Sequence, residues 1–366
     1  MNGIRTKDGL GATLVVILGA TSAVGQTFEN DTGGSVRFYG QFSPTYLSFG
    51  DGDETTDNFV DNANSNTRLG FVIEQPAWGG GLTLTFETAL GFVQTSEVSQ
   101  EETPPALAWE RTDLRKFEAA YAAEFGKLSL GQGSMASDGV ATLDVSGTGI
   151  VGSVTVADVA GAFKFREEGG ALSSVTVSKA FKDYDGGRRF RIRYDTPKFS
   201  GFSVAVAYGQ NILAEDDDTD YYDIGLTWSG TQGDMELAAA VGYAWDAGET
   251  DSERYAGSFS MLHTPTGLNL SLSAGADPDG GSYGYAKAGW KGDLIAPGPT
   301  AFSIDYYDGN DIANDDSSSE AFGLSAVQAF TEIDLELYMG YRAYSYDDTA
   351  AYQDADSFLF GARYKF

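Results

Sequence analysis

Apolar and polar residues alternate along most of the chain, in segments of roughly ten residues that suit the tilted strands of a β-barrel. The stretch RRFRIRYD, residues 188–195, alternates arginine with Phe, Ile and Tyr, and residues 202–208 alternate Phe, Val, Val and Tyr with Ser, Ala and Ala. Because successive side chains of a strand point to opposite faces, each segment has one apolar face and one polar face. The pattern predicts an all-β chain.

Two kinds of connection take turns between these segments. One kind is short and rich in Gly or Pro, and the other is acidic. Alternate connections of a meander lie at opposite ends, so the tight turns would share one end and the acidic loops the other, with about 16 strands between them. The tight turns are QPAWGGG, EFG, DTPKFSG, SGTQG, HTPTG and APGP; the acidic loops are DGDETTDNFVDNAN, EVSQEETPP, AEDDDTD, DAGETDSE, ADPDGG, DGNDIANDDSSSE and DDTAAYQDAD.

The apolar face of every strand can be kept away from water in two ways. A soluble sandwich covers it with a second sheet, whereas a membrane barrel turns it to lipid and keeps the polar face in a water-filled lumen. Beyond residue 25 no apolar stretch approaches the ~20 residues that a membrane-spanning helix needs, so any crossing would use strands. Short turns at one end and longer loops at the other favour the transmembrane antiparallel barrel.

One connection is far longer than the others. About 55 residues separate FGKLSLGQ from RRFRIRYD, and they carry Asp138, Asp144 and Asp158. A structureless loop of that length is uncommon in a compact domain unless it has a function. We therefore expect this long third loop to fold into the lumen of the barrel.

Composition narrows the class of protein. The 366 residues carry a formal net charge of −30 and contain no Cys, which argues against nucleic acid as a partner and gives no disulfide framework. Residues 1–25 read as a signal peptide, with a basic start, an apolar run and small residues near the end. The sequence thus predicts an exported chain with one β-barrel domain over residues 26–366.

The chain resembles the general diffusion porins of Gram-negative bacteria, most closely the alphaproteobacterial, Rhodobacter-type porins. The resemblance rests on NTRLGFVIEQPAWGGGLTLTFETALGF, on EAAYAAEFGKLSLGQG, on RIRYDTPKFSGFSVAVAYG and on the terminal FLFGARYKF, which ends in Phe366. It implies a homotrimer of sixteen-stranded barrels in the outer membrane, each narrowed by its third loop. It also implies a terminal strand read by the barrel-assembly machinery. We expect the acidic loops to form a solvated surface that faces lipopolysaccharide, and we expect a passive channel to need no cofactor.

A pore of this kind is selective through the charges that line it. We expect Arg189, Arg191 and Arg193 to form a basic wall, because their partners in the alternation are apolar and must face outward. Carboxylates on the long loop would oppose them and create a transverse field for ions and small hydrophilic solutes. The further basic candidates are Arg37, Arg68 and Arg115, and the acidic candidates are Asp138, Asp144 and Asp158.

Three other functions stay open at this point. A substrate-selective channel would need a saturable site in the lumen, and a soluble sandwich or adhesin would need no lipid. A barrel-embedded hydrolase would need a nucleophile and a base, and geometry alone recognises such a pair. The glycine patterns GTGIVG and GGSYG lie outside the strand-to-helix context that their motifs require, and His263 lies in a predicted turn. The sequence therefore predicts no enzyme and no metal site.

Overall fold

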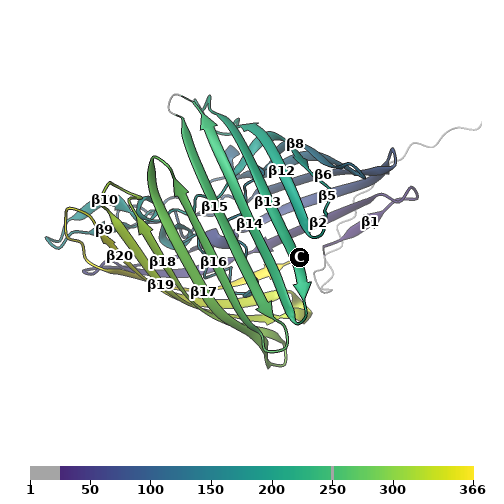
Figure 1. Ribbon diagram of the computed structural model, residues 1–366. Coiled ribbons are helices and arrows are strands. Elements are labelled where there is room, and N and C mark those ends of the chain that lie inside the picture. Colours follow the sequence, from purple (N-terminus) through teal and green to yellow (C-terminus); the bar gives the residue numbers. More distant parts are fainter. Residues whose placement is uncertain (1–24, 249–250) are drawn as a thin grey trace, which may run out of the picture.

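The computed structural model describes residues 25–248 and 251–366, which form a closed antiparallel β-barrel of sixteen strands (Figure 1). The predicted all-β class and transmembrane barrel architecture are confirmed. Among the described residues no helix has the length and apolarity that crossing a membrane requires. The predicted signal peptide, residues 1–25, lies almost entirely outside the described residues.

Each wall strand pairs with its neighbours in sequence. The first strand consists of β2 and β3, and the second consists of β4 and β5, which the short helix η1 (Ala63–Ser65) separates. The wall strands are β2 (Ser35–Phe42), β3 (Pro44–Gly50), β4 (Thr55–Asp61), β5 (Arg68–Ala77), β6 (Gly80–Ala89), β7 (Leu114–Ala123), β8 (Gly126–Ser134), β11 (Arg188–Asp195), β12 (Phe202–Gln210), β13 (Asp220–Gln232), β14 (Met235–Ala247), β15 (Ser252–His263), β16 (Leu268–Asp277), β17 (Gly280–Ile295), β18 (Gly298–Asn310), β19 (Ser318–Phe330), β20 (Leu335–Asp347) and β21 (Ala355–Lys365).

The last strand closes the barrel on the first. β21 pairs with β20 on one side and with both β2 and β3 on the other. Beyond the end of β21, the edge of β2 is covered by β1 (Thr27–Glu29). The backbone groups of Phe366 and Gly40 exchange two hydrogen bonds, of 2.8 and 3.0 Å. The sheet consequently has no open edge along this seam.

Burial along the strands is the reverse of that in a soluble protein. On β18 the apolar side chains of Phe302, Ile304 and Tyr306 are exposed, whereas the alternating Asp305 and Tyr307 are buried. On β11 the same alternation exposes Phe190 and Ile192 and buries Arg191. Such an arrangement is stable where lipid meets the outside of the barrel.

The two-ended arrangement of connections is also confirmed. The tight turns all join strands at one end of the barrel, the turn end, and the acidic loops lie at the other, the loop end. One acidic loop was predicted too long, because residues 55–61 of DGDETTDNFVDNAN form strand β4 and only residues 51–54 form the turn. Its alternate Thr, Asn and Val residues pair across to β3, so acidity alone is a poor guide to where a strand begins.

The long third loop does fold into the barrel. It spans residues 135–187, here called the inner loop, and it contains α1 (Ala157–Ala160), β9 (Lys164–Arg166), β10 (Leu172–Thr176) and α2 (Val177–Ala180). The β9–β10 hairpin lies at the loop end, near the end of β20, where the ring of Phe165 stacks on that of Tyr346 with centroids 5.4 Å apart (Figure 1). There Arg166 donates two hydrogen bonds to Asp51, of 3.0 and 2.8 Å, and so ties the inner loop to the first outer turn.

The absence of cysteine allows a direct test of which end faces outward. We expect an Asp218→Cys variant, at the loop end, to react on intact cells with a maleimide too large to pass a channel. A Thr264→Cys variant, in a tight turn, should react only after the outer membrane is permeabilised. Both positions are exposed, so burial does not separate them. Equal labelling on intact cells would contradict the topology.

Candidate functional site

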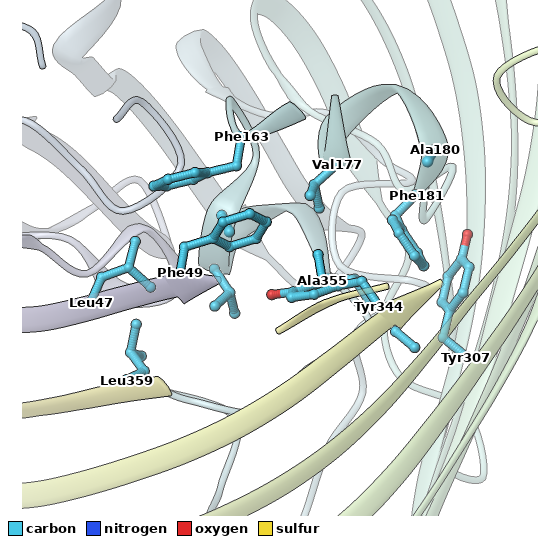
Figure 2. Packing of buried hydrophobic residues seen from close by; sticks show 14 of the residues in the cluster. Leu47, Phe49, Phe163, Val177, Ala180, Phe181, Tyr307, Tyr344, Ala355 and Leu359 are labelled. Atoms are coloured by element: carbon cyan, nitrogen blue, oxygen red, sulfur yellow. The ribbon is translucent and has the colours of Figure 1, made fainter. Parts of the chain in front are cut away.

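The inner loop packs against one side of the barrel wall through a hydrophobic core inside the lumen. The rings of Phe163 and Phe49 stack with centroids 4.2 Å apart, and Phe181 packs on Tyr307 at 5.2 Å. Figure 2 shows these loop residues against Leu47 and the other inward side chains of β3, β18, β20 and β21. Apolar burial on this scale holds the loop firmly in one position.

Polar contacts fix the same loop at several further points. Lys287 on β17 is buried and donates 2.6 Å hydrogen bonds to Asp144 and to the carbonyl of Gly152. The carboxylate of Asp223 on β13 accepts hydrogen bonds from the backbone N–H groups of Ala136 and Ser137, at 3.0 and 2.7 Å. These bonds satisfy loop backbone groups that the barrel interior would otherwise leave without partners.

The space that the inner loop leaves free lies on the opposite side, against the shorter strands. A cavity of about 370 Å³ opens there, here called the arginine chamber. It meets a second cavity, of about 330 Å³, under the 90–113 loop, and both are bounded by Gln94, Thr112 and Asp113. The wall of the arginine chamber includes Asn66, Arg115, Gln132, Arg188, Arg189 and Asn211.

The three arginines of the alternating stretch do not act alike. Arg191 is buried, pairs with Glu118 and donates to the carbonyls of Gly131 and Ser134. Arg193 donates to Asp195, at 2.7 Å, and to the carbonyls of Ser134 and Met135, where the inner loop begins. Both therefore face inward but anchor the loop, and of the three only Arg189 lines the arginine chamber.

Arg189 and the other basic candidates occupy different levels of the wall. The guanidinium of Arg189 lies 4.0 Å from the ring centroid of Tyr221. Arg68 and Arg115 share the carboxylate of Glu87, at 3.8 and 2.7 Å. Arg37 lies nearer the turn end, over the ring of Tyr39, and lines neither cavity.

Sequence reasoning missed Arg188, which lines the arginine chamber beside Arg115 and Arg189. The alternation assigned its position to the apolar face. That rule holds within a strand, and Arg188 is the first residue of β11, where the inner loop ends. A run of two arginines at a strand boundary was the available signal.

The acidic candidates lie on the inner loop as predicted, but they differ in environment. Burial alone would raise the pKa of Asp144, yet the nearby Lys287 ammonium outweighs it and holds that pKa below its usual range. Burial, reinforced by the charge of Asp183, raises the pKa of Asp158 to about 6. Asp138 is close enough to attract Arg188. The pairing of Asp144 with a lysine thus removes it from any role opposite the arginines.

Two further carboxylates on the inner loop were not among the candidates. Burial raises the pKa of Asp183, and it raises the pKa of Asp185 to about 7, with added repulsion from Asp183 and Asp138. They alternate in the segment KDYDGG just before β11, which was a recognisable strand-like pattern. Within the described ranges, no group of His, Cys, Asp or Glu side chains is arranged to hold a metal ion.

The remaining features that the sequence singled out are a histidine, two glycine patterns and the terminal phenylalanine. His263 ends β15 at the turn end, and its Nδ1 lies 2.7 Å from the hydroxyl of Thr266. Ser282, in the GGSYG pattern, lies within β17, and the GTGIVG pattern lies within the inner loop. The ring of Phe366 is partly exposed on the outside of the seam and packs near Tyr364.

Comparisons with known proteins agree with this architecture. The family model for Gram-negative porins matches residues 12–366. An anion-selective porin from Comamonas acidovorans is 14% identical, with a TM-score of 0.60 over 91% of this chain and 100% of that one. OmpF of Salmonella typhi, solved with daunomycin, is 13% identical, with a TM-score of 0.56 over 93% and 100%.

A trimer form of in-vitro folded OmpT, an outer membrane protein of Vibrio cholerae, is 16% identical, with a TM-score of 0.54 over 91% of this chain and 99% of that one. No curated protein matches the sequence. At these identities the solved structures support the fold, and the family match does not distinguish an alphaproteobacterial subtype.

The buried Lys287–Asp144 pair yields a stability prediction. A Lys287→Met variant leaves Asp144 charged and unpaired inside the barrel, which we expect to cost about 3–5 kcal/mol of unfolding free energy. The measurement is the unfolding transition in detergent, monitored by the difference in gel mobility between heated and unheated samples.

A Lys287→Met/Asp144→Asn variant provides the matched control. It should be closer to wild type than the single variant, because neither charge is left without its partner. A single variant as stable as the wild type would contradict this role of the pair.

Proposed function

Because the chain belongs to the Gram-negative porin family, we propose that its barrel is a general diffusion pore whose narrowest part lies between the arginine chamber and the inner loop. The protein is an outer-membrane channel for passive diffusion. The observation that supports the location of the constriction is the position of the inner loop, which fills one side of the lumen and leaves open space beside Arg115, Arg188 and Arg189.

The proposed selectivity depends on charges of opposite sign across this gap. Arg68, Arg115, Arg188 and Arg189 form the basic side, and Asp138, Asp158, Asp183 and Asp185 form the acidic side. A transverse field between such groups orients dipolar solutes and penalises bulky apolar ones. In this proposal Arg191 and Arg193 hold the inner loop in place, and Arg37 acts only on ions near the turn end.

We also propose that the pore has no enzymatic activity. Its one histidine is bonded to a threonine in a tight turn, which gives no support for a nucleophile–base pair. The runner-up function is a substrate-selective channel, and the Nε of Arg188, which is buried without a hydrogen-bond acceptor, favours it over a hydrolase.

A homotrimer is the proposed assembly. On the outside of β2, β5, β6 and β7, four phenylalanine rings lie in a row, with neighbouring centroids 5.4 to 6.5 Å apart. Of these, β6 and β7 are complete wall strands of 10 residues each, whereas β13, β14, β17, β18, β19 and β20 have 13 to 16. A short wall with an aromatic surface suits contact with another subunit better than contact with lipid. The row comprises Phe38, Phe71, Phe86 and Phe117.

Three further expectations concern export and surroundings. Residues 1–25 would direct export, the terminal Phe366 would be read by the barrel-assembly machinery, and the acidic loops would face lipopolysaccharide. The exposed outer aromatics Tyr208 of β12 and Trp245 of β14 are proposed to lie at the membrane interface.

Planar-bilayer recording tests the proposed pore. Purified protein should insert in steps of three conductance levels. The cation preference should be weak, because loop carboxylates farther than a Debye length of about 8–10 Å from the constriction are screened at physiological salt. An Arg188→Gln variant should increase cation preference, and an Arg37→Gln variant should change it less. Protein that is folded but forms no conducting steps would refute the pore.

The raised pKa values on the inner loop predict a pH dependence. Carboxyl groups with pKa near 6 for Asp158 and near 7 for Asp185 lose their negative charge as pH falls through this range. Cation preference should therefore decrease on acidification, measured as a shift of the reversal potential in a salt gradient. An Asp185→Asn variant should show a smaller shift, whereas Asp218→Asn, on an outer loop, should behave like wild type. A reversal potential that is constant over this pH range would argue against the acidic side.

A further inference from the structure

Within the described residues, the guanidinium of Arg188 in the arginine chamber has no protein partner. The Nε of Arg188 is buried without a hydrogen-bond acceptor, and no ion pair or hydrogen bond of its side chain occurs within the described part of the chain. The Nε of Arg189 is unpartnered too, although its Nη1 donates to the carbonyl of Arg188 at 2.8 Å. Buried guanidinium groups in proteins are normally hydrogen-bonded to carboxylates, carbonyls or anions.

Several arginine side chains also lie close together around this group. Arg68 is repelled by Arg115, Arg188 and Arg363 together, and Arg115 and Arg188 repel each other. Among the described residues, Arg68 and Arg115 share Glu87 as their ion-pair partner. Further carboxylates near the chamber include Asp113 in its wall, Asp138 on the inner loop, and Asp217, which accepts a 2.8 Å hydrogen bond from the side chain of Asn211. Crowded cations of this kind are costly unless an anion offsets their repulsion.

The chamber has room and donors for such an anion. At about 30 Å³ per water molecule, 370 Å³ holds roughly a dozen waters, or a solute of a few heavy atoms with part of its hydration shell. Asn66, Gln132 and Asn211 place side-chain amides in the same wall as Arg115 and Arg188. Guanidinium and amide donors together recognise the oxygens of carboxylates and phosphates better than they recognise chloride, which has no fixed acceptor directions.

We propose that the arginine chamber is a saturable binding site for a small divalent oxyanion, such as inorganic phosphate or a short dicarboxylate. This inference rests on the proposed function, since the chamber would be a binding site along the diffusion path of the pore. The anion accepts hydrogen bonds from Arg188 and Arg189 and offsets the repulsion that Arg115 and Arg68 experience. Glu87 and Asp138 compete for the same guanidinium groups, so binding stays weak enough for release, as conduction requires.

Competition with chloride current tests the site. Single channels are recorded in KCl, and inorganic phosphate or succinate is added at a pH where each is divalent. We expect both to reduce the current with saturation, and to do so less at higher KCl because screening weakens the attraction. The more effective of the two shows whether one tetrahedral anion or two separate carboxylates fit the chamber.

Arg188→Gln is the main variant. Arg37→Gln is its matched control, because this variant also removes one positive charge from the barrel wall, at a position that does not line the arginine chamber. Loss of the charge-assisted hydrogen bonds should weaken the block roughly 10- to 100-fold in Arg188→Gln. The strength of the block by phosphate or succinate should remain unchanged in Arg37→Gln. If Arg188→Gln does not fold, Arg188→Lys, which keeps the charge but lacks the planar fork, should weaken the block by a smaller factor.

The outcomes separate this inference from the proposed function. Wild-type channels that conduct KCl, but whose current neither anion reduces with saturation, would overturn the oxyanion site and leave the pore intact. Equal weakening in Arg188→Gln and Arg37→Gln would also overturn it, because the effect would then be a general loss of positive charge. Absence of any conducting step would refute the pore itself, and the site with it.

Discussion

Hydrocarbon offers no hydrogen-bond partner to a peptide group, so every backbone N–H and C=O within a membrane must be paired inside the protein. The pairing of β21 with β20, β2 and β3 meets this requirement by closing the sheet. Closure in turn separates the two faces of each strand into an outside that meets lipid and an inside that holds water or protein. The exposed Phe302 and Ile304 beside the buried Asp305 follow directly from it.

The inside of this barrel has two distinct halves. One half is a protein core, where the inner loop buries Phe163 and Phe181 against inward aromatic rings, and where Lys287 meets Asp144. A buried ion pair adds little net stability, but it penalises any arrangement in which one partner is left alone. The loop is therefore held in one position by apolar contacts and in one register by charges. The other half stays open, and its width depends on that register.

The sequence was sufficient to predict the strands, the two ends and the location of the long loop, because alternation and turn chemistry are local signals. It was insufficient for the roles of individual charges. Arg191 and Arg193 occupy the same face of the alternating strand as Arg189, yet they donate hydrogen bonds to the carbonyls of Ser134 and Met135. Which arginine faces water depends on where the inner loop returns to the wall, and that is set by contacts between residues far apart in the chain. The inward tyrosines of β17, β18 and β20 were a missed signal that this part of the wall packs against protein.

Net charge and pore charge differ in this protein. The formal charge of −30 reflects many carboxylates in the acidic loops, whereas the open half of the lumen is lined by arginine. Charges separated from the constriction by more than a Debye length act weakly on an ion inside it, but a guanidinium in a narrow, low-dielectric wall acts strongly. The basic side of the gap therefore weakens the cation preference that the net charge alone would produce, because the field at the constriction depends on the nearest few side chains. The position of the inner loop decides which side chains these are, so the apolar packing of the loop indirectly controls the electrostatics of the pore.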